Sequence, residues 1–428
     1  MYNHKTIAKT YTFLKNMRKP QNEILNIQWR LLKETLNYAY ENVQIYRERF
    51  NEAGLTPDDI QSPDDMLKLP TISKYDLQGE RVKKLISTEF VFNDLIPMKT
   101  SGSTGIPTVS YFSKDSLFYL MWVLKYRSKA FCGLRLFDPV AIFCAESEGE
   151  VQRKNSQPIR RLLNIKYFSI YSSKKNLETE FLRVKPKIIY GFPSFLIDFI
   201  CHLEKNHIGY DKCKMVFTSS ELLDEHQRKL IENYFSCRLY DIYGSVEFKE
   251  IAFECSQKKG YHINADFFYI EFVKNGKNAA PDKDAEIIVT SLQTKAMPLI
   301  RYRIGDIARV SSEKCSCGCN FPLMTMVCGR KGDYLTFHGE KIPYYEINRT
   351  LRESLQDTIY KFQFIQMAQN KVIVKLIVND KYSDFVKSRL KENLEAQIGK
   401  DIEINVCLEE EINNQQNGKF CSVQSVLS

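Results

Sequence analysis

The feature that most constrains the fold of this chain is an alternation of strand-like and helix-like segments between residues 139 and 243. Apolar runs of four or five residues, typical of strands buried on both faces, alternate with segments whose apolar residues recur at helical spacing. This alternation predicts a parallel sheet with helices on its faces. Strands are expected at Pro139–Phe143, Lys187–Tyr190, Lys214–Thr218 and Arg238–Tyr243, and helices at Ser194–His202 and Asp224–Phe235.

The segments on either side of this region follow other patterns. Helices are expected at Gln21 to about Phe50 and at Asp115–Phe131, and Ser73 is expected to cap a helix that follows it. From Tyr261 onwards strands dominate, and they are expected at residues 268–273, 286–290, 299–302 and 306–310.

After Gly329 the pattern becomes helix–strand–strand–helix–strand within about 100 residues, which is typical of a compact α+β domain. The predicted fold class is therefore α/β. A large N-terminal domain (residues 1–331) would hold mixed or parallel sheets and a β-rich subdomain, and a small α+β C-terminal domain (residues 332–428) would follow.

Composition limits the class of protein. No run of about 18 apolar residues occurs, so no transmembrane segment is expected. Residues 1–20 are polar and basic and lack the apolar core of a signal peptide, which favours a cytoplasmic protein whose 12 cysteines are mostly reduced.

The net charge of +9 is concentrated before residue 331. The densest basic stretch, from Arg153 to Lys175, could meet a polyanion, a membrane surface or the phosphates of a cofactor, or it could be a solvated face. Nucleic-acid binding is not expected, because the pI is moderate and no known binding module is visible.

A short loop rich in Ser, Thr and Gly, at residues 100–107, is a candidate anion site. Its flanks, residues 90–96 and 108–112, are apolar and predict a strand–loop–strand element. Glycines permit positive φ, and backbone amides and hydroxyls can converge on a phosphate. An ordinary polar turn would have the same composition. The candidate phosphate contacts are Thr100, Ser101, Gly102, Ser103, Thr104 and Gly105.

Several further short motifs follow this loop in a fixed order. They are Tyr190-Gly191-Phe192-Pro193-Ser194, Ser220-Glu221, Tyr243-Gly244-Ser245-Val246-Glu247, Tyr302-Arg303-Ile304-Gly305-Asp306, Gly329-Arg330-Lys331-Gly332-Asp333 and Gly418-Lys419. Their joint order over nearly the whole chain resembles the adenylate-forming (acyl-CoA synthetase) superfamily, within it the phenylacetate–CoA ligase branch, and particularly the CapK-like proteins linked to polysaccharide biosynthesis.

This resemblance implies a role for each motif. The loop would hold the β- and γ-phosphates of ATP, Glu247 would bind Mg²⁺, and Asp306 would accept hydrogen bonds from the ribose. Lys419 would offset charge that develops at the α-phosphate, and Arg330 would assist near the ribose or the phosphates. The adenine would be framed by Ser220, Glu221, Asp241 and Tyr243.

The resemblance also implies an acyl pocket and a hinge. Tyr190, Phe192, Pro193 and Gly244 would border the acyl group, and core packing explains the nearby Phe248 equally well. The C-terminal domain would swing between an adenylation pose and an acyl-transfer pose. Gly332 and Asp333 would form the hinge, because glycine tolerates large φ/ψ changes.

One group of cysteines differs from the scattered ones. Cys255 and His262 flank a turn, and this pairing resembles a Cys…His stretch of some phenylacetate–CoA ligase relatives. With Cys315 and Cys317 they would supply four ligands to a structural zinc ion, with Cys319 or Cys328 as substitutes. The spacing Cys-x-Cys-x-Cys is tighter than a usual zinc knuckle, so free thiols are the alternative.

The implied reaction is ATP-dependent activation of a small carboxylic acid as an acyl-adenylate, followed by acyl transfer to coenzyme A. One alternative is transfer to an amine or hydroxyl in the biosynthesis of a capsular or surface polysaccharide, and another is a non-catalytic nucleotide-binding relative. Relatives often dimerise, so a homodimer is possible. The chain departs from the family at Ile106, where many relatives carry Lys, and at Gln415-Gln416-Asn417, where Pro-Arg is common.

Overall fold

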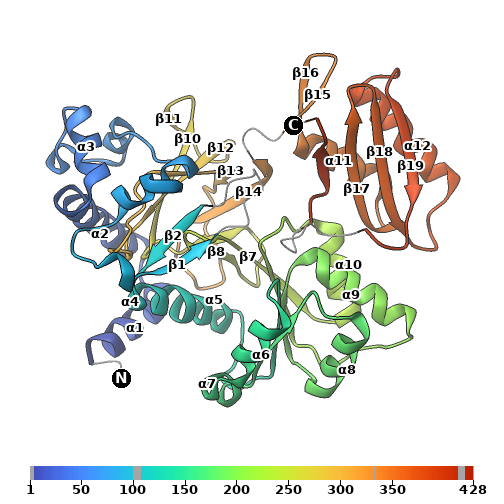
Figure 1. Cartoon of the computed structure of the whole chain (residues 1–428), viewed down its shortest axis with the longest axis horizontal. Helices are drawn as coiled ribbons and strands as arrows, with labels where there is room; N and C mark the ends of the chain where they lie inside the picture. The colour runs from blue at the N-terminus through green and yellow to red at the C-terminus, as the bar shows by residue number, and fades with distance from the viewer. Residues whose placement is uncertain (1–3, 100–107, 331–333, 413–419, 428) are drawn as a thin grey trace. The chain divides into compact units, whose positions relative to one another are not determined.

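The computed structural model describes residues 4–99, 108–330, 334–412 and 420–427. The chain forms two compact units, one of residues 1–133 with 242–331 and the other of residues 134–241 with 332–428. Figure 1 labels the helices and strands of both units. The expected division into domains 1–331 and 332–428 stays a prediction.

The first unit begins with helices and short 3₁₀ turns. The expected helix from Gln21 to Phe50 is interrupted, because the backbone of the buried Val43 is extended and ends one helix where the next begins. Ser73 caps the turn after it through a capping box with Asp76, as predicted. These elements are α1 (His4–Asn16), α2 (Gln21–Asn42), α3 (Gln44–Glu52) and the turns η1 (Pro57–Asp59), η2 (Pro63–Lys68), η3 (Lys74–Leu77), η4 (Gly79–Leu85) and η5 (Phe92–Asp94).

A two-stranded hairpin and a helical segment come next. Strand β1 (Ile96–Lys99) pairs antiparallel with β2 (Val109–Phe112), so the predicted strand–loop–strand element is present. Its first strand begins at Ile96, however, and residues 92–94 form a turn where a strand was expected. The expected helix at 115–131 consists of α4 (Lys114–Phe118), the π-helical turn η6 (Tyr119–Leu124) and α5 (Lys125–Phe131).

The predicted β-rich part of the first unit is an antiparallel sheet. The expected strands at 299–302 and 306–310 form one strand, β13, which starts at Tyr302, and residues 299–301 precede it. The order is β11-β10-β12-β13-β14-β9-β8, with the end of β7 pairing with β8. The strands are β7 (Arg238–Ser245), β8 (Lys249–Glu254), β9 (Tyr261–Ile263), β10 (Phe268–Lys274), β11 (Lys277–Asn278), β12 (Ala285–Ser291), β13 (Tyr302–Val310) and β14 (Leu323–Arg330).

A buried ion pair joins the helical and β parts of this unit. The side chains of Arg127 and Asp266 are both fully buried, and the guanidinium makes two hydrogen bonds to the carboxylate, of 2.7 and 3.0 Å. Arg127 also donates to the backbone oxygen of Phe13 in α1, and Asp266 accepts from Asn16. One guanidinium therefore connects α5, α1 and the segment between β9 and β10.

The second unit contains the predicted parallel sheet, in the order β6-β5-β3-β4. The two predicted helices are present as α9 and α10, whereas the elements between residues 145 and 187 were not predicted. The elements are β3 (Val140–Cys144), α6 (Glu148–Ser156), α7 (Pro158–Leu162), β4 (Ile165–Ser169), α8 (Lys174–Val184), β5 (Ile188–Gly191), α9 (Pro193–Lys205), β6 (Met215–Ser219) and α10 (Glu225–Phe235).

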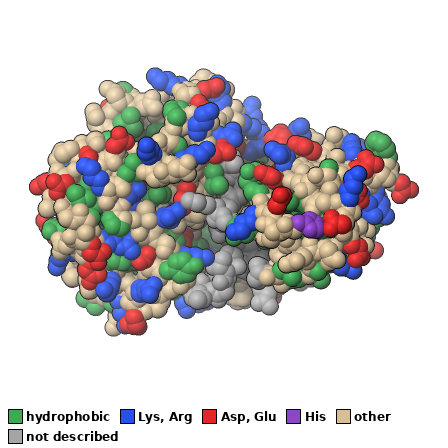
Figure 2. Space-filling model, turned by 90° about the horizontal axis from the view of Figure 1, so that it is seen from above, with side chains coloured by type: hydrophobic (Ala, Val, Ile, Leu, Met, Phe, Trp, Pro, Cys, Tyr) green, Lys and Arg blue, Asp and Glu red, His purple; other side chains and the backbone are tan. Residues whose placement is uncertain are grey.

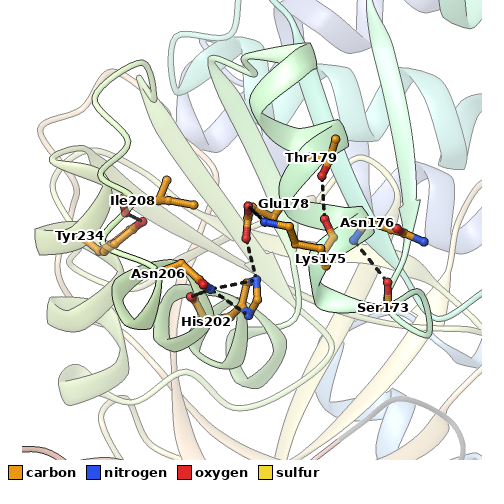
Figure 3. Close-up of polar contacts among 9 residues, drawn as sticks. All are labelled: Ser173, Lys175, Asn176, Glu178, Thr179, His202, Asn206, Ile208 and Tyr234. Atoms are coloured by element: carbon orange, nitrogen blue, oxygen red, sulfur yellow. Dashed lines mark hydrogen bonds and ion pairs between the residues drawn. The ribbon is translucent and has the colours of Figure 1, made fainter.

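Polar contacts join helices α8 and α9 (Figure 3). Glu178 of α8 lies 2.9 Å from His202 Nε2 of α9 and accepts from Lys175 at 2.8 Å. Lysines of the basic stretch also pair with acidic side chains, for example Lys154 with Glu146. Figure 2 shows Lys and Arg interspersed with Asp and Glu over the face that it draws. These pairings favour a solvated face for the basic stretch.

The C-terminal part of the second unit is the predicted α+β fold. Both of its helices contribute to one hydrophobic core with the sheet β19-β18-β17-β20. The hairpin β15–β16 and the parallel edge strand β20 were not predicted. The elements are β15 (Tyr334–Phe337), β16 (Glu340–Pro343), α11 (Tyr344–Leu355), β17 (Ile359–Ala368), β18 (Lys371–Val378), α12 (Asp384–Ile398), β19 (Glu403–Leu408) and β20 (Val423–Ser425).

The Arg127–Asp266 pair gives a stability prediction. Arg127→Met leaves a buried carboxylate without its cation, so we expect the free energy of unfolding to fall by about 3–5 kcal/mol. Both tryptophans, Trp29 and Trp122, belong to the first unit. Urea unfolding followed by tryptophan fluorescence therefore measures the effect.

The control is Arg30→Met, which removes an exposed pair with Glu34 on α2 and should change stability by less than about 0.5 kcal/mol. Equal effects of the two substitutions would contradict the role assigned to the buried pair.

Candidate functional site

Several expected site residues lie outside the described residues. They are the phosphate-loop residues Thr100, Ser101, Gly102, Ser103, Thr104 and Gly105, the hinge residues Gly332 and Asp333, and Lys419. The structure does describe the strands on either side of the loop. They are β1 and β2, which pair antiparallel, with Lys99 opposite Val109.

In the first unit, two of the expected nucleotide residues meet. The hydroxyl of Tyr243, near the end of β7, donates to Asp306 Oδ2 of β13 at 2.7 Å. Asp306 is also paired in register with Arg330 of β14 through the backbone. The three residues come from distant motifs, and the antiparallel sheet brings them to one place. A carboxylate held in this way can accept hydrogen bonds from a diol.

The expected magnesium ligand lies in the tight connection between β7 and β8. Glu247 accepts a hydrogen bond from the hydroxyl of Tyr302 at 3.2 Å. Gly244 makes the connection possible, because a Cβ there would lie 1.9 Å from the backbone oxygen of Lys249. Phe248 is buried and packs against Phe268 and Tyr302, which favours the core-packing alternative for this residue.

Lys249, two residues after Glu247, is a candidate site residue that the sequence did not reveal. Its ammonium donates to the backbone oxygen of Val246 at 2.7 Å and lies 5.0 Å from the ring centroid of Phe112 in β2. Burial, together with the nearby Lys125, lowers its pKa to about 8, while Glu247 acts in the opposite direction. No motif distinguishes this lysine in the sequence, because its surroundings come from strands that are far apart in the chain.

In the second unit, polar side chains gather at the carboxyl ends of β5 and β6. The hydroxyls of Tyr190 and Ser219 lie 2.5 Å apart, and Ser219 lies 3.3 Å from Ser220. Ser220 has a φ of 74°, a strained conformation for a residue with a side chain. The buried Asp241 accepts from Thr218 at 2.6 Å. These groups lie where parallel sheets bind ligands.

Glu221 makes three hydrogen bonds within the second unit, and its contact with adenine stays a prediction. Its carboxylate accepts hydrogen bonds from the backbone and the hydroxyl of Ser194, at 3.0 and 2.9 Å, and from the backbone N–H of Phe420 at 2.7 Å. Burial raises the pKa of Glu221, and these hydrogen bonds act against that shift. Both oxygens of the Glu221 carboxylate accept hydrogen bonds, from three donors in total. The carboxylate therefore joins the start of α9 to the segment that begins at Phe420.

Two of the expected acyl-pocket residues, Phe192 and Pro193, lie at the start of α9. Phe192 is the N-cap of this helix and packs against the hydrophobic core of the second unit, and Pro193 occupies its first turn. Their contact with an acyl group stays a prediction.

The four predicted zinc ligands come together in the first unit. The ligand atoms of Cys255, His262, Cys315 and Cys317 all lie within 4.8 Å of one another. The sulfurs of Cys255 and Cys315 are 3.5 Å apart, and Cys317 Sγ is 3.2 Å from His262 Nε2. In a tetrahedral zinc–thiolate site two sulfurs lie about 3.8 Å apart, so the cluster has the dimensions of a metal site.

Contacts around the cluster orient two of its ligands, His262 and Cys317. His262 Nδ1 lies 3.1 Å from the carbonyl oxygen of Phe321, a contact that turns Nε2 toward the sulfurs. The backbone N–H of Cys319 donates to Cys317 Sγ, although the Cys319 thiol is not part of the cluster. Gly260 allows the turn before β9, because a Cβ there would lie 2.6 Å from the Met324 oxygen.

Comparison with known proteins shows which families the chain resembles. Residues 335–425 match the family model of the CapK C-terminal domain. The chain is 27% identical over 362 residues to the phenylacetate–coenzyme A ligase of Escherichia coli K12, covering 80% of this chain and 77% of that protein. It is 24% identical over 406 residues to protein CapK of Staphylococcus aureus, covering 91% and 86% of the two chains.

A solved structure shares the fold. The structure of 2-hydroxyisobutyryl-CoA ligase in the postadenylation state, in complex with R3-HIB-AMP, superimposes with a TM-score of 0.79 at 19% identity. The match covers 96% of this chain and 91% of that one. Among the described residues, no helix has the length and apolarity that crossing a membrane requires.

The environment of Lys249 gives a pH prediction. The unfolded chain keeps this proton up to a pH of about 10.4, whereas the folded protein loses it near pH 8. Between these values the unfolded state binds more protons, so this lysine makes stability rise with pH. We expect the stability of the wild type relative to Lys249→Met to rise between pH 8 and 10, by no more than about 1.4 kcal/mol per pH unit.

Urea unfolding at pH 7, 8, 9 and 10, followed by tryptophan fluorescence, measures this difference. A difference that stays constant with pH would contradict the lowered pKa.

Proposed function

We infer that this chain, which belongs to the phenylacetate–CoA ligase and CapK branch of the adenylate-forming ligase superfamily, is an AMP-forming acid–thiol ligase. We propose that it activates a small carboxylic acid with ATP and transfers the acyl group to coenzyme A. Two hydrogen bonds carry this proposal. Tyr243 donates to Asp306, and Tyr302 donates to Glu247. They link the motif that contains Tyr243 and Glu247 to the motif that contains Tyr302 and Asp306.

The proposed chemistry begins with attack of a carboxylate oxygen on the α-phosphorus of ATP, which releases pyrophosphate. Asp306 accepts hydrogen bonds from the ribose hydroxyls, and Tyr243 fixes the direction of its carboxylate. Glu247, held by Tyr302, would supply the hard oxygen that a Mg²⁺ ion prefers, and such an ion would supply positive charge against the phosphates.

Further residues are assigned to the same reaction. The loop from Thr100 to Gly105 holds the phosphates through amides and hydroxyls, and Lys419 offsets the charge that develops at the α-phosphate. Arg330, paired in register with Asp306, assists near the ribose or the phosphates. Ser220, Glu221, Asp241 and Tyr243 frame the adenine, and Tyr190, Phe192, Pro193 and Gly244 border the acyl group.

A second candidate function differs only in the acyl acceptor. Residues 335–425 match the CapK C-terminal domain. The resemblance to CapK-like proteins implies an amine or hydroxyl acceptor in the assembly of a surface polysaccharide. The first half-reaction is the same in both cases, so the acceptor separates the two functions.

Pyrophosphate release tests the proposal. Purified protein is mixed with ATP, Mg²⁺ and a panel of carboxylic acids that starts with phenylacetate. We expect release that depends on the acid and falls at least about 100-fold in Lys419→Ala, because that variant lacks the transition-state charge.

Four results are informative. A thioester on addition of coenzyme A supports the first function, and pyrophosphate without a thioester favours the second. Retained AMP binding without pyrophosphate for any acid would contradict both functions and indicate a non-catalytic nucleotide-binding protein. Full adenylation by Lys419→Ala would contradict the role of that lysine.

We also propose that the Cys255, His262, Cys315 and Cys317 cluster holds a structural zinc ion, since three thiolates and one imidazole match a closed tetrahedral site. Elemental analysis of the purified protein should find one zinc per chain. Cys317→Ser should lose the metal and lower the melting temperature, because zinc binding contributes to folding.

Cys319→Ser is the matched control. Its thiol lies outside the cluster, and its backbone N–H still reaches Cys317, so zinc should be retained. Absence of zinc from the wild type, or equal loss in the two variants, would remove this assignment.

A further inference from the structure

The amino ends of four parallel strands meet at one edge of the sheet in the second unit. The strand order is β6-β5-β3-β4, and helices α7 and α8, labelled in Figure 1, lead into β4 and β5 at this edge. The amide of Val140 donates to the backbone oxygen of Asn164. The amide of Lys187 donates to the oxygen of Pro139, and that of Lys214 to the oxygen of Lys187. We call this surface the amino edge, and it consists of residues 134–139, 162–164, 185–187 and 211–214.

Three large apolar side chains of the amino edge face solvent. Leu136 and Phe137 precede β3, and each is 53% exposed, while Leu162 at the end of α7 is 65% exposed. The side-chain amide of Asn164 donates to the backbone oxygen of Phe137 at 3.4 Å, which connects the two segments. Single exposed apolar residues are common, but a group on adjoining segments is typical of an interaction surface.

The backbone of Phe137 gives a second, independent indication. Its φ is 70°, in the left-handed region that bulky residues rarely adopt. Asn adopts this region far more readily, and Asn164 does so at the same edge with a φ of 56°. The chain therefore has an exposed aromatic side chain where the local backbone favours a small polar one. Packing within the protein does not account for this choice, so a function of the exposed side chain does.

The amino edge also carries an excess of positive charge. It contains five basic and two acidic residues, a net charge of +3. Both carboxylates are paired within the edge, Asp138 with Lys214 at 3.1 Å and Asp211 with Lys212 at 3.4 Å. Three further cations make no ion pair in the part of the chain that the structure describes, and they are Arg135, Lys185 and Lys187.

We propose that the amino edge binds the surface of a lipid bilayer that contains anionic phospholipids. Headgroup phosphates attract the unpaired cations, and Leu136, Phe137 and Leu162 leave water by inserting at the level of the acyl chains. A soluble polyanion would use the cations but would leave the three apolar side chains in water. The opposite edge, where Ser219 and Ser220 follow β6, faces away from a bilayer bound in this way. The inference does not depend on the proposed function.

Sedimentation with lipid vesicles tests this inference. The full chain is mixed with vesicles of phosphatidylcholine alone, or of equal parts of phosphatidylcholine and phosphatidylglycerol. We expect binding at least about tenfold stronger to the anionic vesicles. Binding should weaken at least about tenfold between about 0.1 M and about 1 M salt, because the screening length falls from about 10 Å to about 3 Å. Failure to bind the anionic vesicles at the lower salt concentration would overturn the inference.

Two double variants separate the apolar from the charged contribution. Phe137→Asn with Leu162→Ser removes two exposed apolar side chains, and Asn suits the backbone at residue 137. Lys185→Gln with Lys187→Gln removes two unpaired cations. Each double variant should bind the anionic vesicles at least about tenfold more weakly than the wild type. The apolar variant should keep the salt dependence of the wild type, since its charges are unchanged.

Phe385→Ser with Lys400→Gln is the matched control. Both residues are exposed and lie far along the chain from the amino edge, with Phe385 on α12. This variant removes one aromatic ring and one cation, and it should bind vesicles like the wild type. Urea unfolding followed by circular dichroism should give no lower midpoint for any of the variants, because all the changed side chains are exposed.

Other occupants of the amino edge give different results. Wild-type affinity for anionic vesicles in the apolar variant would overturn the inference and indicate a soluble polyanion. A dimer in size-exclusion chromatography that the apolar variant converts to a monomer would also overturn it and assign the edge to a second copy of the chain. Equal loss of vesicle binding in the control and in the edge variants would contradict the location of the membrane-binding surface.

Discussion

The structure depends on carboxylates that leave bulk water and must find donors. A buried carboxylate without partners is costly, so each one draws together donors from distant parts of the chain. The buried Asp266 takes its donors from α1 and α5, and the half-buried Asp306 takes one from β7. Glu221 takes its donors from α9 and from Phe420. The same rule that stabilises the fold therefore also brings the candidate functional groups together.

Periodicity predicted the elements whose apolar residues face one core. Strands β3, β5 and β6 and helices α9 and α10 were predicted correctly. The strands form a parallel sheet, and the apolar residues of the strands and the helices share one hydrophobic core. The elements between residues 145 and 187 are more polar and partly exposed, which hides their pattern. The break at Val43 escaped notice because an apolar residue fits a helix pattern equally well, whether it continues a helix or caps one.

The site was predictable where short motifs specify its chemistry. The ligand types and the pairing of two segments identified the Cys255 and His262 cluster, and the sheet places these segments side by side. The position of Lys249 could not be predicted, because it depends on neighbours from separate elements. Glu221 was identified as a site residue, but its hydrogen bonds to Ser194 and Phe420 become visible only in the folded chain.

The central claim is that an acyl-adenylate forms, and the fate of one oxygen atom tests it most directly. If a carboxylate oxygen attacks the α-phosphorus, that oxygen remains on AMP after the acyl group has been transferred. The protein is supplied with ATP, Mg²⁺, coenzyme A and the active acid labelled with ¹⁸O in its carboxylate, and the AMP is analysed by mass spectrometry. The account predicts one ¹⁸O atom in each AMP. Label in inorganic phosphate instead, or unlabelled AMP, would contradict it.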